Sequence, residues 1–238
     1  MNKFIADSIS LIIPSKNDSK NIVYNLENVE KFLDKNFFEF EILIISNGSL
    51  LQDRDVVDNL IKGKRNIKHI TIEESGKGVA VKTGIEKASF NNVLFSDADF
   101  SVEIDEIENF FTNGKLNSDL VIGSRRSKDS KNLNSPIKRL LAGTMFIYIV
   151  NFVLGIKVKD SQCGFKAFHK KIYLENPFYE KGFIFDVEMI FIAKYLGLKI
   201  SEVPVTYVHQ NESSVNLFRD TFKMALGLIR IFFRYRLG

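Results

Sequence analysis

The sequence predicts an α/β protein with a central, mostly parallel sheet and helices on both of its faces. Three observations predict this class. Short apolar runs alternate with segments of helical periodicity, the links between them are short, and polar or turn-forming residues follow the apolar runs. Alternation of this kind builds parallel sheets that are buried on both faces, and ligands bind beyond the carboxyl ends of their strands.

The first half of the chain follows this pattern from its first strand onward. Residues 10–13 form an apolar run that Pro14 is expected to stop, and Asp18 or Ser19 can cap a helix over 20–35. The other elements expected in this half are strands at 40–45, 67–72, 93–95 and 120–122, and helices at 53–62, 77–88 and 103–111.

The alternation fails after Gly123. The elements expected beyond it are a basic polar loop at 124–135, an apolar helix at 136–155, an irregular segment or short strand at 160–168, a helix at 185–196, a strand-like segment at 200–208 and a basic amphipathic helix at 215–235. With 45% hydrophobic and 26% charged residues, the 238-residue chain suits a single domain, 1–238. We divide it into a nucleotide-binding half (1–123), an acceptor-binding half (124–214) and a basic amphipathic membrane-surface helix (215–238). A helix that packs on the core with a basic outer face is the alternative for the last segment.

Basic residues cluster in two places, although the net charge of +4 is mild. One cluster comprises Arg125, Arg126, Lys128, Lys131, Lys138 and Arg139, and the other comprises Arg219, Lys223, Arg230, Arg234 and Arg236. Such clusters suit phosphates, anionic lipid or nucleic acid, whereas a simple solvated face is the alternative. Because no aromatic-interleaved basic motif is present, we expect no nucleic-acid partner.

Three features bear on location. The single cysteine, Cys163, indicates a reducing compartment, and the first apolar run is too short for a signal peptide. Residues 140–156 carry no charge, but at 17 residues they lie at the lower limit for a membrane span. We expect a core or interfacial helix there, with a true span as the alternative.

Two aspartates follow the apolar run at 93–95. Asp97 and Asp99, one residue apart at the end of a strand, can hold a divalent cation such as Mg²⁺, which proteins bind with one or two carboxylates plus phosphates and water. The alternative is that Asp99 or Ser101 caps the helix at 103–111 while Asp97 is solvated.

A glycine-rich turn opens the helix at 77–88. Its Gly76-Lys77-Gly78 sequence can present backbone amides to an anion, and Lys77 or Lys82 adds positive charge. It matches neither a P-loop nor a dinucleotide fingerprint. The alternative is an ordinary helix start whose glycines allow tight packing, and Asn47-Gly48 can likewise be only a turn.

The order of the motifs resembles family 2 glycosyltransferases with the GT-A fold, and within them the dolichyl-phosphate (polyprenyl-phosphate) glucosyl- and mannosyltransferases. The motifs are LIIPSKND, EILIISNGS, GKGVAVKTG, DADFS, GSRR, DSQCGFKAF, FDVEM and EVPV, and they span residues 9–208 in the family's order. The resemblance implies inverting transfer of a sugar from a nucleotide diphosphate to a polyprenyl phosphate, with Mg²⁺ or Mn²⁺. It also implies a peripheral position on the cytoplasmic face of a membrane, and an integral-membrane partner is possible.

The resemblance also implies roles for single residues. The nucleotide sugar is assigned to Pro14, Asp18, Asn47, Lys77 and Asp97, the metal to Asp97 and Asp99, and the acceptor phosphate to Arg125, Arg126 and Arg139. The catalytic set implied is Asp99, Arg125, Arg139 and Glu188. Asp186 and Glu188 belong to the FDVE helix, which in this family faces the acceptor pocket.

The sequence departs from the family at three places. Ser46-Asn47 stands where Asp-Asp is usual, so the donor base is open and cytosine becomes possible. Gly143 replaces a serine four residues after the acceptor arginine, next to Thr144, and the segment 209–216 lacks the usual Gly-Ser-Lys.

The acceptor class decides whether a base is needed. A lipid phosphate is already an anion and requires none, whereas a sugar hydroxyl would require one, for which Asp186 or Glu188 is the candidate. A family 2 transferase acting on a glycan hydroxyl and a nucleotide-sugar-binding module without turnover are therefore the alternatives. A nucleotidyltransferase is disfavoured, because the loop after the first strand, PSKNDSK, has no glycine.

Overall fold

The computed structural model describes residues 5–210 and 217–236, and the side chains at 138, 139, 217–222 and 236 lie outside the described part. Seven strands form one sheet in the order β10-β7-β9-β4-β1-β2-β3. Their bounds are β1 Ala6–Ser15, β2 Phe37–Asn47, β3 Ile67–Ile72, β4 Asn92–Ser96, β7 Leu120–Ser124, β9 Phe165–His169 and β10 Ile200–Pro204. The sheet is parallel except for β9, which pairs antiparallel with both β4 and β7. The predicted mostly parallel sheet is confirmed.

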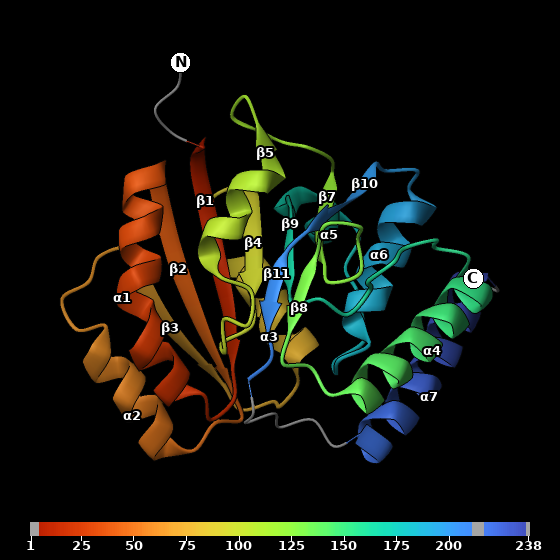
Figure 1. The fold of residues 1–238 in the computed structure, drawn as a ribbon. Helices are drawn as coiled ribbons and strands as arrows, with labels where there is room; N and C mark the ends of the chain where they lie inside the picture. Colours follow the sequence, from red (N-terminus) through yellow and green to blue (C-terminus); the bar gives the residue numbers. More distant parts are fainter. Residues whose placement is uncertain (1–4, 211–216, 237–238) are drawn as a thin grey trace.

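Helices cover both faces of this sheet (Figure 1). They are α1 Ser19–Asn36, α2 Leu51–Leu60, α3 Lys77–Lys87, α4 Ile137–Leu154, α5 Lys170–Glu175, α6 Phe185–Tyr195 and α7 Leu217–Arg236. Two small sheets complete the fold: the hairpin of β5 Phe111–Thr112 with β6 Lys115–Leu116, and the pair of β8 Lys131–Leu133 with β11 Thr206–Val208.

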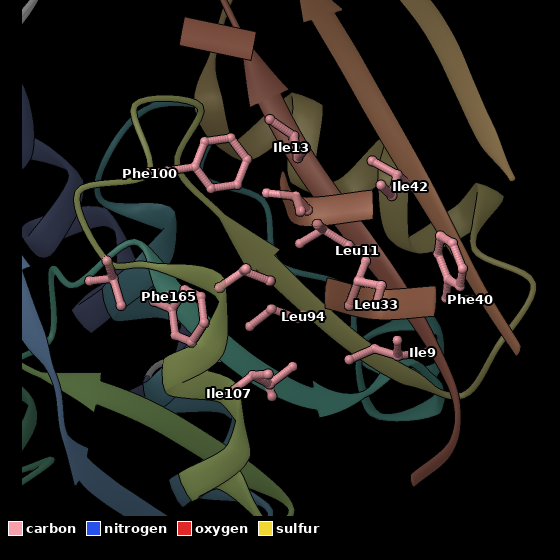
Figure 2. Close-up of a cluster of buried hydrophobic side chains, with 14 of the residues drawn as sticks. Ile9, Leu11, Ile13, Leu33, Phe40, Ile42, Leu94, Phe100, Ile107 and Phe165 are labelled. Carbon is pink, nitrogen blue, oxygen red and sulfur yellow. The ribbon is translucent and has the colours of Figure 1, made fainter. Parts of the chain in front are cut away.

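Successive side chains of the strands point alternately into two apolar layers, one on each face of the sheet, as expected for strands buried on both faces. One layer joins Ile9, Leu11 and Ile13 of β1 to the buried stripe of α1 and to the 3₁₀ helix η1 Ile104–Phe110 (Figure 2). The intervening Ile12 points to the other layer, where α3 and α6 pack.

Several local expectations differ from the structure. Pro14 does not stop β1 but lies inside it in register with Ile45, so the strand continues to Ser15. The helix expected at 103–111 is a 3₁₀ helix, and neither Asp99 nor Ser101 caps it, because its N-cap is Glu103 and no side chain bonds there. Asp18 is the N-cap residue of α1 but makes no side-chain cap bond.

Helices α4 and α7 lie side by side and both begin at the edge where β1 and β2 end (Figure 1). The outer face of α4 exposes a continuous apolar stripe, defined by Ile137, Leu141, Met145, Tyr148, Ile149 and Phe152. On α7 a shorter apolar stripe follows at Leu226, Ile229 and Phe233. None of the helices in the described part of the chain is both long and apolar enough to cross a membrane.

Candidate active site at the carboxyl edge of the sheet

The carboxylate pair lies just beyond β4. The backbone N–H of Asp97 donates to the carbonyl of Gly164 at 3.0 Å, and Oδ1 of Asp99 accepts the backbone N–H of Ser101 at 3.0 Å. The side chain of Asp97 is 40% exposed, so it is open to a ligand. The turn is tight, because Phe100 has φ 46°. This geometry holds both carboxylates at the strand end and leaves the second oxygen of Asp99 unused by the turn.

Gly164 is required for the position of Asp97. A Cβ atom at residue 164 would lie 1.9 Å from Oδ2 of Asp97, a distance at which the carboxylate must move. Gly164, at the end of the segment 160–164, therefore packs directly against Asp97. Gly164 belongs to the DSQCGFKAF motif, but no local pattern in the sequence shows that β9 returns beside β4, so its role is visible only in the fold.

Lys77 joins the carboxylate pair to the protein interior. Its Nζ lies 2.6 Å from Oδ1 of Asp97 and 3.9 Å from Oδ2 of Asp186. The same Nζ lies 5.5 and 5.8 Å from the ring centroids of Phe95 and Phe185. Burial lowers the pKa of Lys77, but Asp97 and Asp186 outweigh burial and raise it above its usual value. Lys77 is therefore a fixed cation at the site.

Lys166 continues this chain of alternating charges. Its ammonium group donates to Asp186 at 2.5 Å and to the carbonyl of Cys163 at 2.6 Å, and the side chain is completely buried. Burial raises the pKa of Asp186, and the two lysines oppose that shift. Asp186 thus supports the site from within the core and is not exposed to a substrate.

Three carboxylates, those of Asp18, Asp97 and Asp99, interact electrostatically in the site. Burial and the neighbouring Asp97 raise the pKa of Asp99, and burial together with Asp99 and Asp97 raises that of Asp18, although a hydrogen bond from Lys16 opposes this. A divalent cation would relieve this repulsion. Among the described residues no group of three or more His, Cys, Asp or Glu could hold a metal by itself. The two aspartates therefore fit a cation whose other ligands come from a diphosphate and water.

The glycines of the 76–78 turn serve close packing, which was the alternative to an anion site. A Cβ atom at Gly76 or Gly78 would lie 2.4 or 2.3 Å from a backbone carbonyl of the 180–181 segment. The N–H of Gly78 donates to the carbonyl of Lys181 at 2.9 Å. Tight packing and anion binding can coexist at this turn, because the Lys77 ammonium group still lies beside Asp97 and supplies a positive charge there.

Asn47 is buried between two loops of the site. Its Nδ2 donates to the carbonyl of Ser15 at 2.8 Å, and its Oδ1 accepts the N–H of Gly76 at 3.0 Å. Both the NH₂ group and the oxygen of the Asn47 amide are thus hydrogen-bonded to loop backbone. This fits a residue that positions the two loops better than one that hydrogen-bonds the donor base directly. Ser46 binds His69, which also binds Asp58, but Ser46 is fully buried and cannot act as a nucleophile.

Arg125 forms a buried, bidentate ion pair with Asp160. Nε and one terminal nitrogen of Arg125 lie 2.6 and 2.8 Å from the carboxylate, and the backbone N–H of Arg125 adds a third bond at 3.0 Å. The guanidinium also lies over the ring of Tyr207. Burial raises and Arg125 lowers the pKa of Asp160, with a net lowering. The ion pair uses two of the five N–H donors of the guanidinium, so the assignment of Arg125 to the acceptor phosphate stays a prediction.

Arg126 lies against the first turns of α4. Its guanidinium donates to the hydroxyl of Thr144 and, at 3.2 Å, to the carbonyl of Leu140. A Cβ atom at Gly143 would lie 2.7 Å from this guanidinium, so the glycine that replaces the family's serine makes room for it. Both arginines line a pocket of about 110 Å³ with Asn132, Ser135 and Leu140.

Two predicted site residues need separate comment. The backbone of Arg139 lies in the first turn of α4, beside this pocket's Leu140, and its side chain is outside the described part. Glu188 is completely buried, and its oxygens accept bonds from the backbone N–H groups of Tyr179 and Glu180 and from Arg234 and Tyr235. The role of general base does not fit Glu188, because its side chain is completely buried and both oxygens already accept hydrogen bonds.

The profile of the family described as Glycosyl transferase family 2 matches residues 10–180, which contain the carboxylate pair, Lys77 and the Arg125–Asp160 pair. The chain belongs to glycosyltransferase family 2. The resemblance seen in its motifs is thereby confirmed, and the nucleotidyltransferase alternative is set aside.

Curated relatives of this glycosyltransferase are similar over nearly all of its length. A dolichyl-phosphate beta-glucosyltransferase of Trichomonas vaginalis is 32% identical, and the alignment covers 97% of this chain and 74% of the relative. The dolichyl-phosphate beta-glucosyltransferase of Dictyostelium discoideum is 30% identical over 100% of this chain and 78% of its own. That of Saccharomyces cerevisiae is 30% identical over 97% of this chain and 75% of its own.

Solved structures confirm the GT-A fold. Glucosyl-3-phosphoglycerate synthase from Mycobacterium tuberculosis in complex with phosphoglyceric acid superposes with a TM-score of 0.69 at 15% identity, covering 96% of this chain and 79% of that one. The complex of the same enzyme with Mn²⁺, uridine diphosphate and phosphoglyceric acid gives 0.68 at 16% identity, covering 96% and 78%. At such identity the likeness concerns the fold alone.

Proposed function

We propose that this glycosyltransferase moves a hexose, with inversion, from a nucleoside diphosphate sugar to a polyprenyl phosphate at a membrane surface. Glucose is the first candidate, because the curated relatives are named dolichyl-phosphate beta-glucosyltransferases. The observation that carries the proposal is the segment 160–164, which joins two loops of opposite charge. Gly164 binds the Asp97 loop, and Asp160 binds the loop of Arg125 and Arg126. A donor diphosphate and an acceptor phosphate would thus meet across one short segment.

The donor half of the site would consist of Asp97, Asp99 and Lys77. Asp97 and Asp99 would hold Mg²⁺ or Mn²⁺ together with the donor diphosphate, which the metal would stabilise as a leaving group. Lys77 would add a fixed positive charge at the start of α3. The loops containing Pro14, Asp18 and Asn47 would shape the wall for the nucleoside.

The acceptor half would rely on the arginines near the start of α4. Arg126 and Arg139 would contact the phosphate, because a guanidinium makes strong charge-assisted bonds with phosphate oxygens. Arg125, already paired with Asp160, would mainly set the shape and potential of the pocket. The polyprenyl tail would then leave along the apolar stripe of α4.

The chemistry requires no general base when the acceptor is a phosphate. A phosphate oxygen attacks the anomeric carbon while the bond to the diphosphate breaks, so one displacement inverts the configuration and no proton is transferred. The burial of Asp186 and Glu188, at 1% and 0% exposure, supports this acceptor over a glycan hydroxyl, which would need a base. Catalysis would then depend on positioning and charge stabilisation.

We place the enzyme peripherally on a membrane, on its cytoplasmic face, where it could also contact an integral-membrane partner. Support comes from the apolar stripe of α4, in which the Phe152 side chain is 91% exposed. Single exposed apolar residues are common, but a continuous stripe of large ones indicates an interaction surface. Amphipathic helices attach to membranes in this way.

A donor and acceptor panel tests the proposal. Purified protein is incubated with UDP-, GDP- and CDP-sugars and Mg²⁺ or Mn²⁺, and release of nucleoside diphosphate is measured with a short polyprenyl phosphate, the matching polyprenol and a free glycan. Release that requires the polyprenyl phosphate supports the proposal. Release with the polyprenol or glycan, but not with the lipid phosphate, would reject it.

A further inference from the structure

We propose that α7, through Arg230 and Arg234, acts as a clamp that positions the 76–78 turn and thereby sets the affinity for the donor nucleotide. The inference rests on the proposed function in one respect, namely that this turn belongs to the donor site. Here the clamp comprises four residues: Glu180, Glu188, Arg230 and Arg234. They are positioning residues, because none of them is argued to touch a substrate.

The clamp begins with two buried carboxylates. Glu180 is 4% exposed and Glu188 is fully buried. Arg230 binds Glu180 through Nε at 3.0 Å and through a terminal nitrogen at 2.5 Å. Arg234 binds Glu188 at 2.8 Å and lies 3.6 Å from Glu180. Within the described part of the chain, the positive charges that pair with these two glutamates come from α7.

The 179–181 segment transmits the position of these carboxylates to the donor turn. Oε2 of Glu188 accepts the N–H groups of Tyr179 and Glu180, at 2.8 and 2.6 Å, which fixes the backbone of that segment. The carbonyl of Lys181 in turn accepts the N–H of Gly78 at 2.9 Å. Since Gly76 and Gly78 leave no room for a Cβ atom against this segment, its movement must displace the turn that carries Lys77.

Helix α7 fits closely over this connection. At Gly227 a Cβ atom would lie 2.6 Å from Ile184 and 3.2 Å from Glu180, so the helix approaches the start of α6 at a glycine. The guanidinium of Arg234 also lies 4.9 Å from the ring of Tyr179. The family profile ends at residue 180, so α7 lies beyond the matched region. The alignments with the curated relatives cover 97–100% of the chain and so extend over α7.

The clamp connects the donor site to α7, whose outer face is exposed. Withdrawal of α7 would leave two buried carboxylates without their cations, which is strongly unfavourable. Nucleotide binding and the seating of α7 must then favour each other, because a coupling free energy acts equally in both directions. The outward residues Leu226 and Ile229 are exposed, so contact of α7 with a membrane can alter this equilibrium.

The test combines hydrogen exchange with nucleotide affinity. Exchange of the peptides containing residues 76–82 and 223–236 is measured by mass spectrometry with and without nucleotide and Mn²⁺, using whichever of UDP, GDP and CDP binds most tightly. In the wild-type protein, nucleotide should slow exchange in both peptides. The variant Arg230→Gln/Arg234→Gln should exchange faster at 76–82 without nucleotide and should bind nucleotide about tenfold more weakly.

Matched variants separate the clamp from general effects of charge or stability. Lys223→Gln removes one positive charge from the exposed surface of the same helix and should change neither reading. Arg234→Lys keeps the charge and should recover part of the affinity. If the double variant does not fold, the wild-type measurement alone decides.

Each outcome has a distinct meaning. Nucleotide that protects 76–82 but leaves 223–236 unchanged would overturn the clamp, as would a folded double variant with normal exchange and affinity. Faster exchange at 76–82 without a change in nucleotide affinity would support the mechanical link and instead reject the placement of the donor at this turn.

Discussion

Lys77 at the start of α3 forms an ion pair with Asp97 at the end of β4, with 2.6 Å between Nζ and Oδ1. These residues are 20 positions apart in the sequence and belong to two different motifs. Their contact places a fixed cation beside the carboxylate pair, where a metal and a diphosphate would bind. The ion pair is thus the point at which the glycine-rich turn and the Asp-X-Asp turn become one site.

Asp99→Asn should abolish transfer and metal-dependent nucleotide binding while leaving the fold intact. The change keeps the size of the side chain and its hydrogen bond to Ser101, but removes the charge that a divalent cation requires. Mn²⁺ titration by calorimetry in the presence of nucleotide, together with turnover, checks this. A folded variant with normal metal-dependent turnover would show that the metal is held elsewhere.

Gly164→Ala should inactivate the enzyme by displacing Asp97. The added Cβ atom would lie 1.9 Å from Oδ2 and 2.3 Å from Cγ of Asp97, so the carboxylate would have to leave the position in which it faces Lys77 and Asp99. Gly182→Ala is the control, because a Cβ atom at 182 meets nothing within 4 Å. Nucleotide affinity and turnover of both variants are measured after thermal melts establish folding. Equal activities would mean that Asp97 tolerates a shift and is not a precise ligand.

Lys166→Met should destabilise the protein by about 3–5 kcal/mol, because it leaves Asp186 buried without its closest cation. The double variant Lys166→Met/Asp186→Asn should recover part of this loss, since it removes the unpaired charge as well. Urea unfolding of the wild type, both single variants and the double variant gives the coupling energy. Additive losses would contradict an interaction between the two side chains.

Arg126→Ala and Arg139→Ala should each impair use of the polyprenyl phosphate about ten- to a hundredfold while nucleotide affinity changes little. The loss corresponds to a hydrogen bond to a charged group, worth about 1.5–3 kcal/mol. Acceptor titrations at saturating nucleotide sugar measure it, with Lys128→Ala as a control in the same basic loop. Acceptor kinetics within about twofold of wild type in both variants would place the lipid phosphate elsewhere.

Phe152→Ser should weaken binding to liposomes, because Phe152 belongs to the apolar stripe of α4 and its burial contributes about 1.5–3 kcal/mol. Tyr24→Ser, at an exposed position on α1 across the molecule, is the control (Figure 1). Flotation with anionic liposomes at low and high salt also tests the electrostatic part. Arg230 and Arg234 are paired with the buried Glu180 and Glu188. We therefore expect liposome binding to depend less steeply on salt than it would if all five basic residues of the C-terminal cluster were free. Identical flotation of both variants and wild type would exclude the stripe as the membrane contact.

The sequence alone determined the architecture and brought together the residues that we propose as the donor site. Regular alternation of strand and helix periods places Asp97, Asn47 and the 76–78 turn at the carboxyl edge of a parallel sheet, whatever the detailed packing. That inference needs only local periodicity and the direction of parallel strands. It extends to the existence of α4 and α7, which are predicted from a long uncharged run and from helical spacing, but not to which of their residues face outward.

Only the tertiary structure decided how the charges are partnered. Lys166, Asp160 and Gly164 enter the site because β9 runs antiparallel between β4 and β7, a return that no local pattern specifies. The same holds for Glu188, a candidate base by its sequence position, which is fully buried and pairs with Arg234. Period and polarity are properties of neighbouring residues. The partner of a buried charge is set by which distant segment covers it, and that depends on the packing of the whole chain.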